Sequence, residues 1–339
     1  MKKAIQQVAA GESLTSGSAE EVMARIMAGE ATPAQIAGLL VALRLKGETV
    51  DEIAGFAQAM RSVANPLDLQ RDDLVDTCGT GGDGANTFNI STTAALIAAA
   101  AGVPIAKHGN RAVSSACGSA DVLEALGVRL VSEPEQLRRC LAAAGIAFLF
   151  APAQHPAMKH AIGPRRELGL RTVFNLLGPL TNPAGARRQV IGVYDTALVV
   201  PLAEVLGRLG AHHVMVVHGA GGLDEISTLG PTEVAEWRDG DLHVGRIEPA
   251  VHGISVATAA DLRGGDGAEN ATIVRDILAG ATGPRRDIAL LNAAAAIYVS
   301  GQVGDLSAAM VTATAAVDSG AATRTLETLV AVSTEETAS

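Results

Sequence analysis

The sequence predicts an α/β fold in which a small N-terminal helical domain precedes a larger α/β domain with a central, mostly parallel sheet. Two observations predict this fold. Residues 1–61 carry several helix-start signals and no competing strand pattern. From Leu74 onward, short apolar segments alternate with helical segments and glycine turns, which is typical of a parallel sheet covered by helices. The length of 339 residues is compatible with roughly two domains.

Three short patterns mark helix starts in the N-terminal part. Each has a hydroxyl residue at the cap and Glu or Gln three residues later, which is the capping-box pattern. They are Ser18–Glu21, Thr32–Gln35 and Thr49–Glu52. Pro33 then occupies the first helical position, which proline favours. We expect the helical domain to extend over residues 1–71.

Strands and helices alternate through the rest of the chain. The expected strands are Leu74–Asp76, Val103–Lys107, Ile146–Phe150, Gln189–Tyr194 and His213–Val217. The expected helices are Thr92–Ala101, Ala120–Leu126, Glu133–Ala144, one between His155 and Arg166, Ala197–Leu209, Ile288–Val299 and Ala308–Ala316. Ser91 and Ser119 stand where they would open or cap two of these helices.

The composition argues against nucleic-acid-binding, disulfide-rich and membrane proteins. The net charge of −10 disfavours nucleic-acid binding, because that binding depends on Lys and Arg contacts with phosphates. The three cysteines show no CxxC spacing, which argues against a disulfide framework or a structural zinc site. No signal-peptide pattern follows Met1, and the longest apolar run, Ala94 to Val103, is about half of a membrane span. We therefore expect a cytoplasmic protein without membrane association.

A glycine-rich loop, Gly79–Gly84, follows the first expected strand and precedes a helix. Glycines let backbone N–H groups approach an anion closely, and the next helix adds its positive end. The spacing matches neither a Walker loop nor a dinucleotide-binding fingerprint. A plain strand-to-helix turn is the alternative. The small polar residues Asn89, Ser91 and Thr92 at the helix start favour a phosphate site.

Lys107, His108 and Asn110 stand at the end of the second expected strand. Ligands of open α/β sheets bind at the carboxyl ends of strands, so this cluster and the glycine loop should face one crevice. Lys107 offers a charge for phosphate, and the other two offer hydrogen bonds. A solvated basic turn is the alternative interpretation.

Two further signals lie later in the chain. Asp224 and Glu225 follow the strand His213–Val217 and a glycine-rich turn, and their carboxylates suit Mg²⁺, which shares oxygen ligands with substrate phosphates. Arg165 could bind a carboxylate through two parallel hydrogen bonds. Adjacent acids and paired arginines are also common on surfaces, so each signal is weak alone.

Together these segments resemble the anthranilate phosphoribosyltransferase family over essentially the whole chain. The matching segments are DTCGTGGDGANTFNIST at 76–92, AKHGNR at 106–111, GSADVLEALGV at 118–128, FAPAQHPAMKHAIGPRRELGLRTVFNLLGPLTNPA at 150–184 and VVHGAGGLDEIS at 216–227. Five motifs in the right order are far more specific than any one of them.

The resemblance implies a fold similar to that of pyrimidine nucleoside phosphorylases. A returning segment at about 172–186 would join the helical domain, leaving 72–171 and 187–339 as the α/β domain. It also implies transfer of the phosphoribosyl group of phosphoribosyl pyrophosphate (PRPP) to the amine of anthranilate, in tryptophan biosynthesis, and a homodimer formed through the helical domains.

The resemblance also assigns site residues. The implied PRPP-binding residues are Gly79, Gly82, Asp83, Thr87, Asn89, Ser91, Thr92, Lys107 and Ser119. The implied anthranilate-binding residues are Gly79, His108, Asn110, His155 and Arg165. The implied ligands of Mg²⁺, with two ions expected, are Ser91, Asp224 and Glu225. No residue is assigned as a catalytic acid or base, and a strong general base is not required; Lys107 and the Gly79 loop would stabilise pyrophosphate in the transition state.

The chain departs from the family pattern at one point. Ala116 and Cys117 stand where many members carry Lys and Ser, so we expect at most a higher requirement for PRPP. Two alternatives are a pyrimidine nucleoside phosphorylase of the same fold and a non-catalytic, nucleic-acid-binding paralogue. The sequence makes no statement about association with anthranilate synthase.

Overall fold

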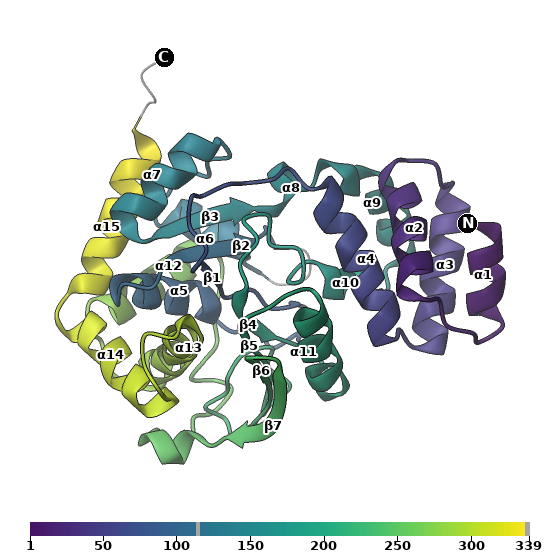
Figure 1. The fold of residues 1–339 in the computed structure, drawn as a ribbon. Coiled ribbons are helices and arrows are strands. Elements are labelled where there is room, and N and C mark those ends of the chain that lie inside the picture. Colours follow the sequence, from purple (N-terminus) through teal and green to yellow (C-terminus); the bar gives the residue numbers. More distant parts are fainter. Residues whose placement is uncertain (113–115, 336–339) are drawn as a thin grey trace.

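Seven strands form a single sheet at the centre of the larger part of the molecule (Figure 1). The structure is a computed structural model that describes residues 1–112 and 116–335. The strand order is β3-β2-β1-β4-β5-β6-β7. The first five strands run parallel, and β6 and β7 are antiparallel additions at one edge. The strands are β1 Val75–Asp76, β2 Ile105–Gly109, β3 Ile146–Phe150, β4 Arg188–Gly192, β5 His213–Gly219, β6 Thr232–Arg238 and β7 Asp241–Ile247.

The chain begins with four helices that stand to one side of the sheet (Figure 1). They are α1 Lys2–Ala9, α2 Ser16–Met27, α3 Pro33–Lys46 and α4 Val50–Val63. The expected capping boxes form at Thr32 and Thr49. The expectation for Ser18 is wrong, because α2 begins earlier and the Thr15 hydroxyl accepts the Ser18 N–H at 3.3 Å. An upstream hydroxyl therefore provides the cap.

A later stretch of the chain returns to these helices. It contains α8 Ala151–Gln154, the 3-10 turn η1 Pro156–Met158, α9 Lys159–Leu168 and α10 Phe174–Leu177. α9 packs against α2 and α3, and α10 packs against α4. The half-buried Arg61 of α4 connects the two parts, since its guanidinium donates to the carbonyls of Leu180 at 2.7 Å and Leu209 at 3.1 Å. We propose that α9 and α10 both belong to the helical domain.

The two faces of the sheet bury separate sets of side chains. In β5, Met215 and Val217 join one core, whereas Val214 and Val216 join the other, as the alternation of strand side chains requires. The first core includes α5, α12 and α13, and the second includes α11 and the N-terminal helices. The remaining helices are α5 Ile90–Ala100, α6 Ser119–Ala125, α7 Pro134–Ala144, η2 Thr196–Leu198, α11 Val199–Arg208, η3 Pro249–His252, α12 Gly267–Leu278, α13 Pro284–Ser300, α14 Leu306–Asp318 and α15 Ala321–Thr334.

Some elements differ from the sequence expectations. Ser91 lies inside α5, whose N-cap is Asn89, and Ser119 is the first residue of α6, whose N-cap is Gly118. Neither serine therefore acts as a cap. The α12 and α15 helices and the β6–β7 hairpin were not expected. Among the described residues, no helix is both long enough and apolar enough to span a membrane.

Candidate active site

The polar segments identified in the sequence meet at one edge of the sheet. The glycine loop follows β1, Asn110 follows β2, and Asp224 and Glu225 follow β5. These three strands are parallel, so their carboxyl ends open on the same side. This edge is where open α/β sheets bind their ligands.

Direct contacts join the acidic pair to the glycine loop and to α5. The Gly81 N–H donates to Asp224 Oδ2 at 2.7 Å, and the Ser91 N–H donates to Glu225 Oε1 at 3.2 Å. A Cβ at Gly79 would lie 2.7 Å from Asp224 Oδ2, so any side chain there would displace the Asp224 carboxylate. The loop and the acids therefore form one packed unit.

The backbone next to the acidic pair is also held by a side chain on α13. The Asn292 side chain on α13 accepts the Ile226 N–H at 2.9 Å and donates to the Ile226 carbonyl at 2.8 Å. A Cβ at Gly192 would fall 1.5 Å from the Asp224 carbonyl oxygen, so glycine is required there too. We did not identify Asn292 from the sequence, although a lone Asn in the alanine-rich segment Ile288–Val299 is an available signal.

The carboxylates of this pair suit a divalent cation. Burial and repulsion from neighbouring acids, including Asp83, raise the pKa of both Asp224 and Glu225. A cation would relieve that repulsion. The described residues contain no cluster of three or more His, Cys, Asp or Glu side chains that would enclose a metal alone. The site therefore fits Mg²⁺, which takes a few protein oxygens and completes its shell with phosphate oxygens and water.

Lys107 is placed differently from our expectation. Its side chain is buried, and Nζ donates to the Thr77 carbonyl at 2.5 Å and to the Ser91 hydroxyl at 3.3 Å. In this conformation the ammonium lies beneath the start of α5 instead of projecting into the crevice.

The other implied PRPP residues surround the same loop. The Gly82 carbonyl accepts a hydrogen bond from Arg171, and Asp83 accepts the Ala85 N–H at 3.1 Å. Thr87 forms an isolated β-bridge with Arg263. Thr92 is buried, and its hydroxyl has no hydrogen-bond partner within residues 1–112 and 116–335.

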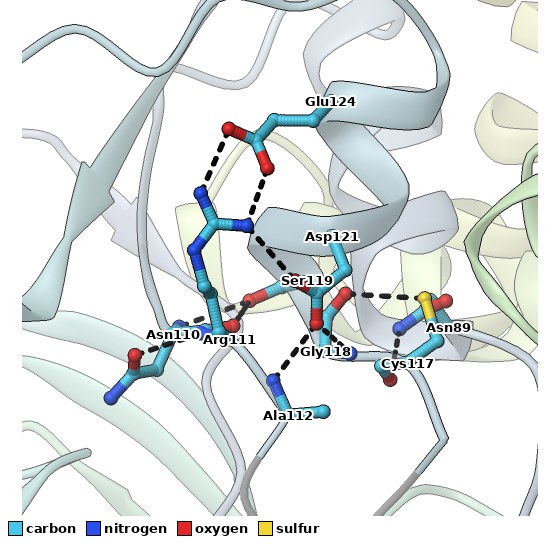
Figure 2. Close-up of polar contacts among 9 residues, drawn as sticks. All are labelled: Asn89, Asn110, Arg111, Ala112, Cys117, Gly118, Ser119, Asp121 and Glu124. Atoms are coloured by element: carbon cyan, nitrogen blue, oxygen red, sulfur yellow. Dashed lines mark hydrogen bonds and ion pairs between the residues drawn. The ribbon is translucent and has the colours of Figure 1, made fainter.

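Asn110 and Ser119 hold each other at the end of β2 (Figure 2). The Asn110 N–H donates to the Ser119 hydroxyl oxygen at 3.2 Å, and that hydroxyl lies 3.2 Å from the Asn110 carbonyl. Asn89 reaches the same loop, because its Nδ2 donates to the Cys117 carbonyl at 3.1 Å. Hydrogen bonds thus connect Asn110, an implied anthranilate-binding residue, with the loop that carries Ser119 and contacts Asn89, two implied PRPP-binding residues. Residues 113–115 of this loop lie outside the described residues.

A pair of buried histidines lies next to this group. The rings of His108 and His155 are 5.3 Å apart, and His108 Nδ1 lies 3.1 Å from the Gly178 carbonyl. Burial lowers the pKa of both, that of His108 to about 3, so both are neutral at pH 7. The Nε2 atom of each has no hydrogen-bond partner in the described part of the chain. Each therefore has an unused polar atom.

Asp76 supports this region from below and was not identified from the sequence. It is fully buried, accepts the His108 N–H at 3.0 Å, and accepts Nδ2 of Asn182 at 2.8 Å. Burial raises its pKa to about 6. Its position at the end of β1, in a segment otherwise noted for glycines, is the signal that could have drawn attention to it.

Arg165 on α9 faces the ring of Phe174, with its guanidinium carbon 5.2 Å from the ring centroid. Burial lowers its pKa. Over the residues that the structure describes, its guanidinium forms no ion pair. A partly buried cation without an acidic partner is suited to bind an anionic ligand.

Comparison with known protein families identifies the family of this chain. A model described as "Glycosyl transferase family, a/b domain" matches residues 71–323, and one described as "Glycosyl transferase family, helical bundle domain" matches residues 2–64. The anthranilate phosphoribosyltransferase of Moorella thermoacetica is 54% identical over 331 residues, covering 98% of each chain. The chain belongs to the anthranilate phosphoribosyltransferase family. The member from Symbiobacterium thermophilum is 55% identical over 327 residues, or 96% of each chain.

Solved anthranilate phosphoribosyltransferases share the fold. The structure from Thermus thermophilus matches with a TM-score of 0.93 and 47% identity, covering 98% of this chain and 99% of that one. The enzyme of Saccharomyces cerevisiae, solved in complex with PRPP and Mg, matches with a TM-score of 0.85 and 29% identity over 94% of this chain and 93% of that one. The same yeast enzyme has been solved with 4-fluoroanthranilate.

Proposed function

We propose that this member of the anthranilate phosphoribosyltransferase family uses the strand-end site to transfer the phosphoribosyl group of PRPP to the amine of anthranilate. The products would be N-(5-phosphoribosyl)anthranilate and pyrophosphate. The observation that carries the proposal is the hydrogen-bonded joining of the glycine loop, the start of α5 and the acidic pair at one sheet edge. That arrangement combines anion-binding amides with metal-binding carboxylates.

The diphosphate of PRPP would lie against the glycine loop. Gly81 and Gly82 have positive φ, which turns the backbone of the loop sharply. The Gly81 N–H is bound to Asp224, so amides further along the loop would face the anion. Ser91, Asp224 and Glu225 would hold Mg²⁺, with two ions proposed; when bound, the metal would neutralise charge on the departing pyrophosphate. Lys107 would add positive potential from beneath Ser91.

Anthranilate would enter from the side of the helical domain. Arg165 would bind its carboxylate, and Asn110 would hydrogen-bond to it. The neutral His108 and His155 would line the approach and offer their unused Nε2 atoms. The aromatic amine is uncharged at pH 7, so the chain needs to orient it and exclude water but does not need a strong base. The amine nitrogen would form a bond to the anomeric carbon as the bond to pyrophosphate breaks, and the amine would then lose one proton to the departing pyrophosphate or to water.

Two further properties are proposals. A homodimer formed through the helical domain is proposed from the resemblance to the family. Light scattering would test it. A cytoplasmic location is proposed because the chain belongs to a family of biosynthetic enzymes.

Separate assays with two substrate pairs test the proposed function. One preparation is offered PRPP with anthranilate and, separately, phosphate with uridine or thymidine. We expect turnover of the first pair only. Phosphorolysis of a nucleoside without transfer to anthranilate would contradict the proposal and favour a nucleoside phosphorylase. A folded chain inactive in both assays would also contradict it.

A further inference from the structure

We propose that Asp121 on α6 is a positioning residue that holds the anthranilate side and the PRPP side of the site in register. This inference rests on the proposed function, because it uses the roles proposed for Asn110 and Ser119. Asp121 itself touches neither substrate in the proposed arrangement. Its carboxylate acts on the backbone that carries those two residues.

One oxygen of Asp121 holds two separated points of the chain. Asp121 Oδ2 accepts the Ala112 N–H at 2.9 Å and the Gly118 N–H at 2.8 Å (Figure 2). These residues lie on the two sides of the segment 113–115. Hydrogen bonds to a carboxylate are roughly twice as strong as those between neutral groups. The carboxylate therefore works as a clamp that draws the two backbone segments together.

The closeness of the two segments requires glycine on one side. A Cβ at Gly118 would lie 2.4 Å from the Ala112 nitrogen and 2.7 Å from the Asn110 carbonyl oxygen. A side chain there would force the segments apart. Asp121 and Gly118 therefore both keep the backbone at Ala112 close to the backbone at Gly118.

The clamped segments carry residues of both substrate sites. Asn110 precedes Ala112, and Ser119 follows Gly118. Their mutual hydrogen bonds of 3.2 Å cross between the segments next to the carboxylate. Asn89 adds a third connection through the Cys117 carbonyl, and Asn270 fixes Asn89 by donating to its Oδ1 at 2.8 Å. Displacing Asp121 should therefore shift contacts with anthranilate and with PRPP together.

The neighbouring ion pairs supply a matched control. Arg111 binds Glu124 through both guanidinium nitrogens, at 2.5 and 2.9 Å, and donates to Asp121 Oδ1 at 3.1 Å. The Glu124 side chain is 40% exposed, and it makes none of the backbone contacts of the clamp. Loss of its charge removes an exposed ion pair, which is worth little in most proteins.

The test compares Asp121→Ala, Asp121→Asn and Glu124→Gln by steady-state kinetics in both substrates. We expect Asp121→Ala to raise the KM for anthranilate and the KM for PRPP by about tenfold or more, because a shift of about 1 Å at a reacting pair has effects of this size or larger. Asp121→Asn keeps one oxygen acceptor and should recover part of the loss. Glu124→Gln should change either KM by less than about twofold.

The outcomes separate the clamp from a merely structural role. Asp121→Ala with both KM values within twofold of the parent would overturn the proposal, as would equal effects of Asp121→Asn and Glu124→Gln. If Asp121→Ala does not fold, the comparison of those two variants decides. An effect on one KM alone would also count against the coupling of the two sides.

A second measurement does not depend on activity. Hydrogen exchange of segments that contain the Ala112 and Gly118 amides, without substrate, should be faster in Asp121→Asn than in Glu124→Gln. Equal exchange in the two variants would overturn the clamp. If the parent chain lacks transferase activity but the exchange difference is found, the proposed function fails while the clamp stands.

Discussion

At the scale of single residues, Arg165 is the side chain whose proposed role is most specific to one substrate. We expect Arg165→Ala to raise the KM for anthranilate by about tenfold or more, since a hydrogen-bonded charged contact contributes about 1.5–3 kcal/mol. The KM for PRPP should change little, because the proposed diphosphate contacts lie at the glycine loop. Steady-state kinetics with each substrate varied in turn measures both values.

The adjacent arginine provides the control for this prediction. Arg166 is on the same helix but exposed. Arg166→Ala should leave both KM values near those of the parent. If Arg165→Ala raises the two KM values equally, Arg165 does not bind anthranilate in the proposed way.

The buried His108 has a consequence for stability as well as for binding. Its folded-state pKa of about 3 is below the value of 6.5 expected when the chain is unfolded. The unfolded state therefore takes up a proton first as pH falls, and stability is lost from about pH 6.5 toward pH 3. Between pH 7 and pH 5 this one group should cost about 2 kcal/mol.

Urea unfolding at the two pH values tests this prediction. The parent chain should lose about 2 kcal/mol more than His108→Gln on going from pH 7 to pH 5, because glutamine does not titrate. His155 contributes in the same direction in both proteins, since burial also lowers its pKa. The same loss in both proteins would show that His108 is not held neutral by burial.

At the scale of secondary-structure elements, Thr32 and Ser18 both fit the capping-box pattern, but only Thr32 caps a helix. The Thr32 hydroxyl accepts the Gln35 N–H in a complete capping box, whereas Ser18 lies inside α2. Thr32→Ala should lower the free energy of unfolding by about 1 kcal/mol. Ser18→Ala should change it by less than about 0.5 kcal/mol, as for most exposed positions. Equal losses in urea unfolding would contradict the assignment of the caps.

The parallel strands and the polar segments at their ends could be predicted because their signals are local. The strand Ile146–Phe150 is confirmed at both ends. Its apolar segment follows Gly145 and ends before Pro152, so the sequence marks both boundaries of the strand. The β6–β7 hairpin was missed although its signal is present. Asp239 and Gly240 both have positive φ and join two alternating strands, which is the arrangement that an Asp-Gly pair favours.

The contacts that support the site could not be predicted in the same way. Asn292, Asn182 and Asp121 bind backbone groups that are near in space, and two of these three are far along the chain from the groups they hold. A pattern of neighbouring residues carries no information about such partners. The position of Lys107 also depended on packing, because burial turned its ammonium toward Thr77 and Ser91.

At the scale of the whole molecule, the site depends on the order of the strands. β1 lies between β2 and β4, and β5 lies beside β4, so the loops after β1, β2 and β5 open on one edge although they are distant in sequence. The N-terminal helices stand to one side of the sheet (Figure 1). Arg165 lies on α9, which packs against α2 and α3, and the ring of His155 lies 5.3 Å from that of His108 on β2. We propose that Arg165 binds the carboxylate of anthranilate, while the glycine loop and the acidic pair bind the diphosphate of PRPP and the metal.

The most direct test of the central claim is the loss of anthranilate fluorescence in the presence of PRPP and Mg²⁺. We expect the parent chain to consume anthranilate only when both are present. An Asp224→Asn, Glu225→Gln double variant, which keeps the shape of the acidic pair but removes its charge, should fold and lose most of this activity. Consumption that continues unchanged without Mg²⁺, or in the double variant, would contradict the proposed site.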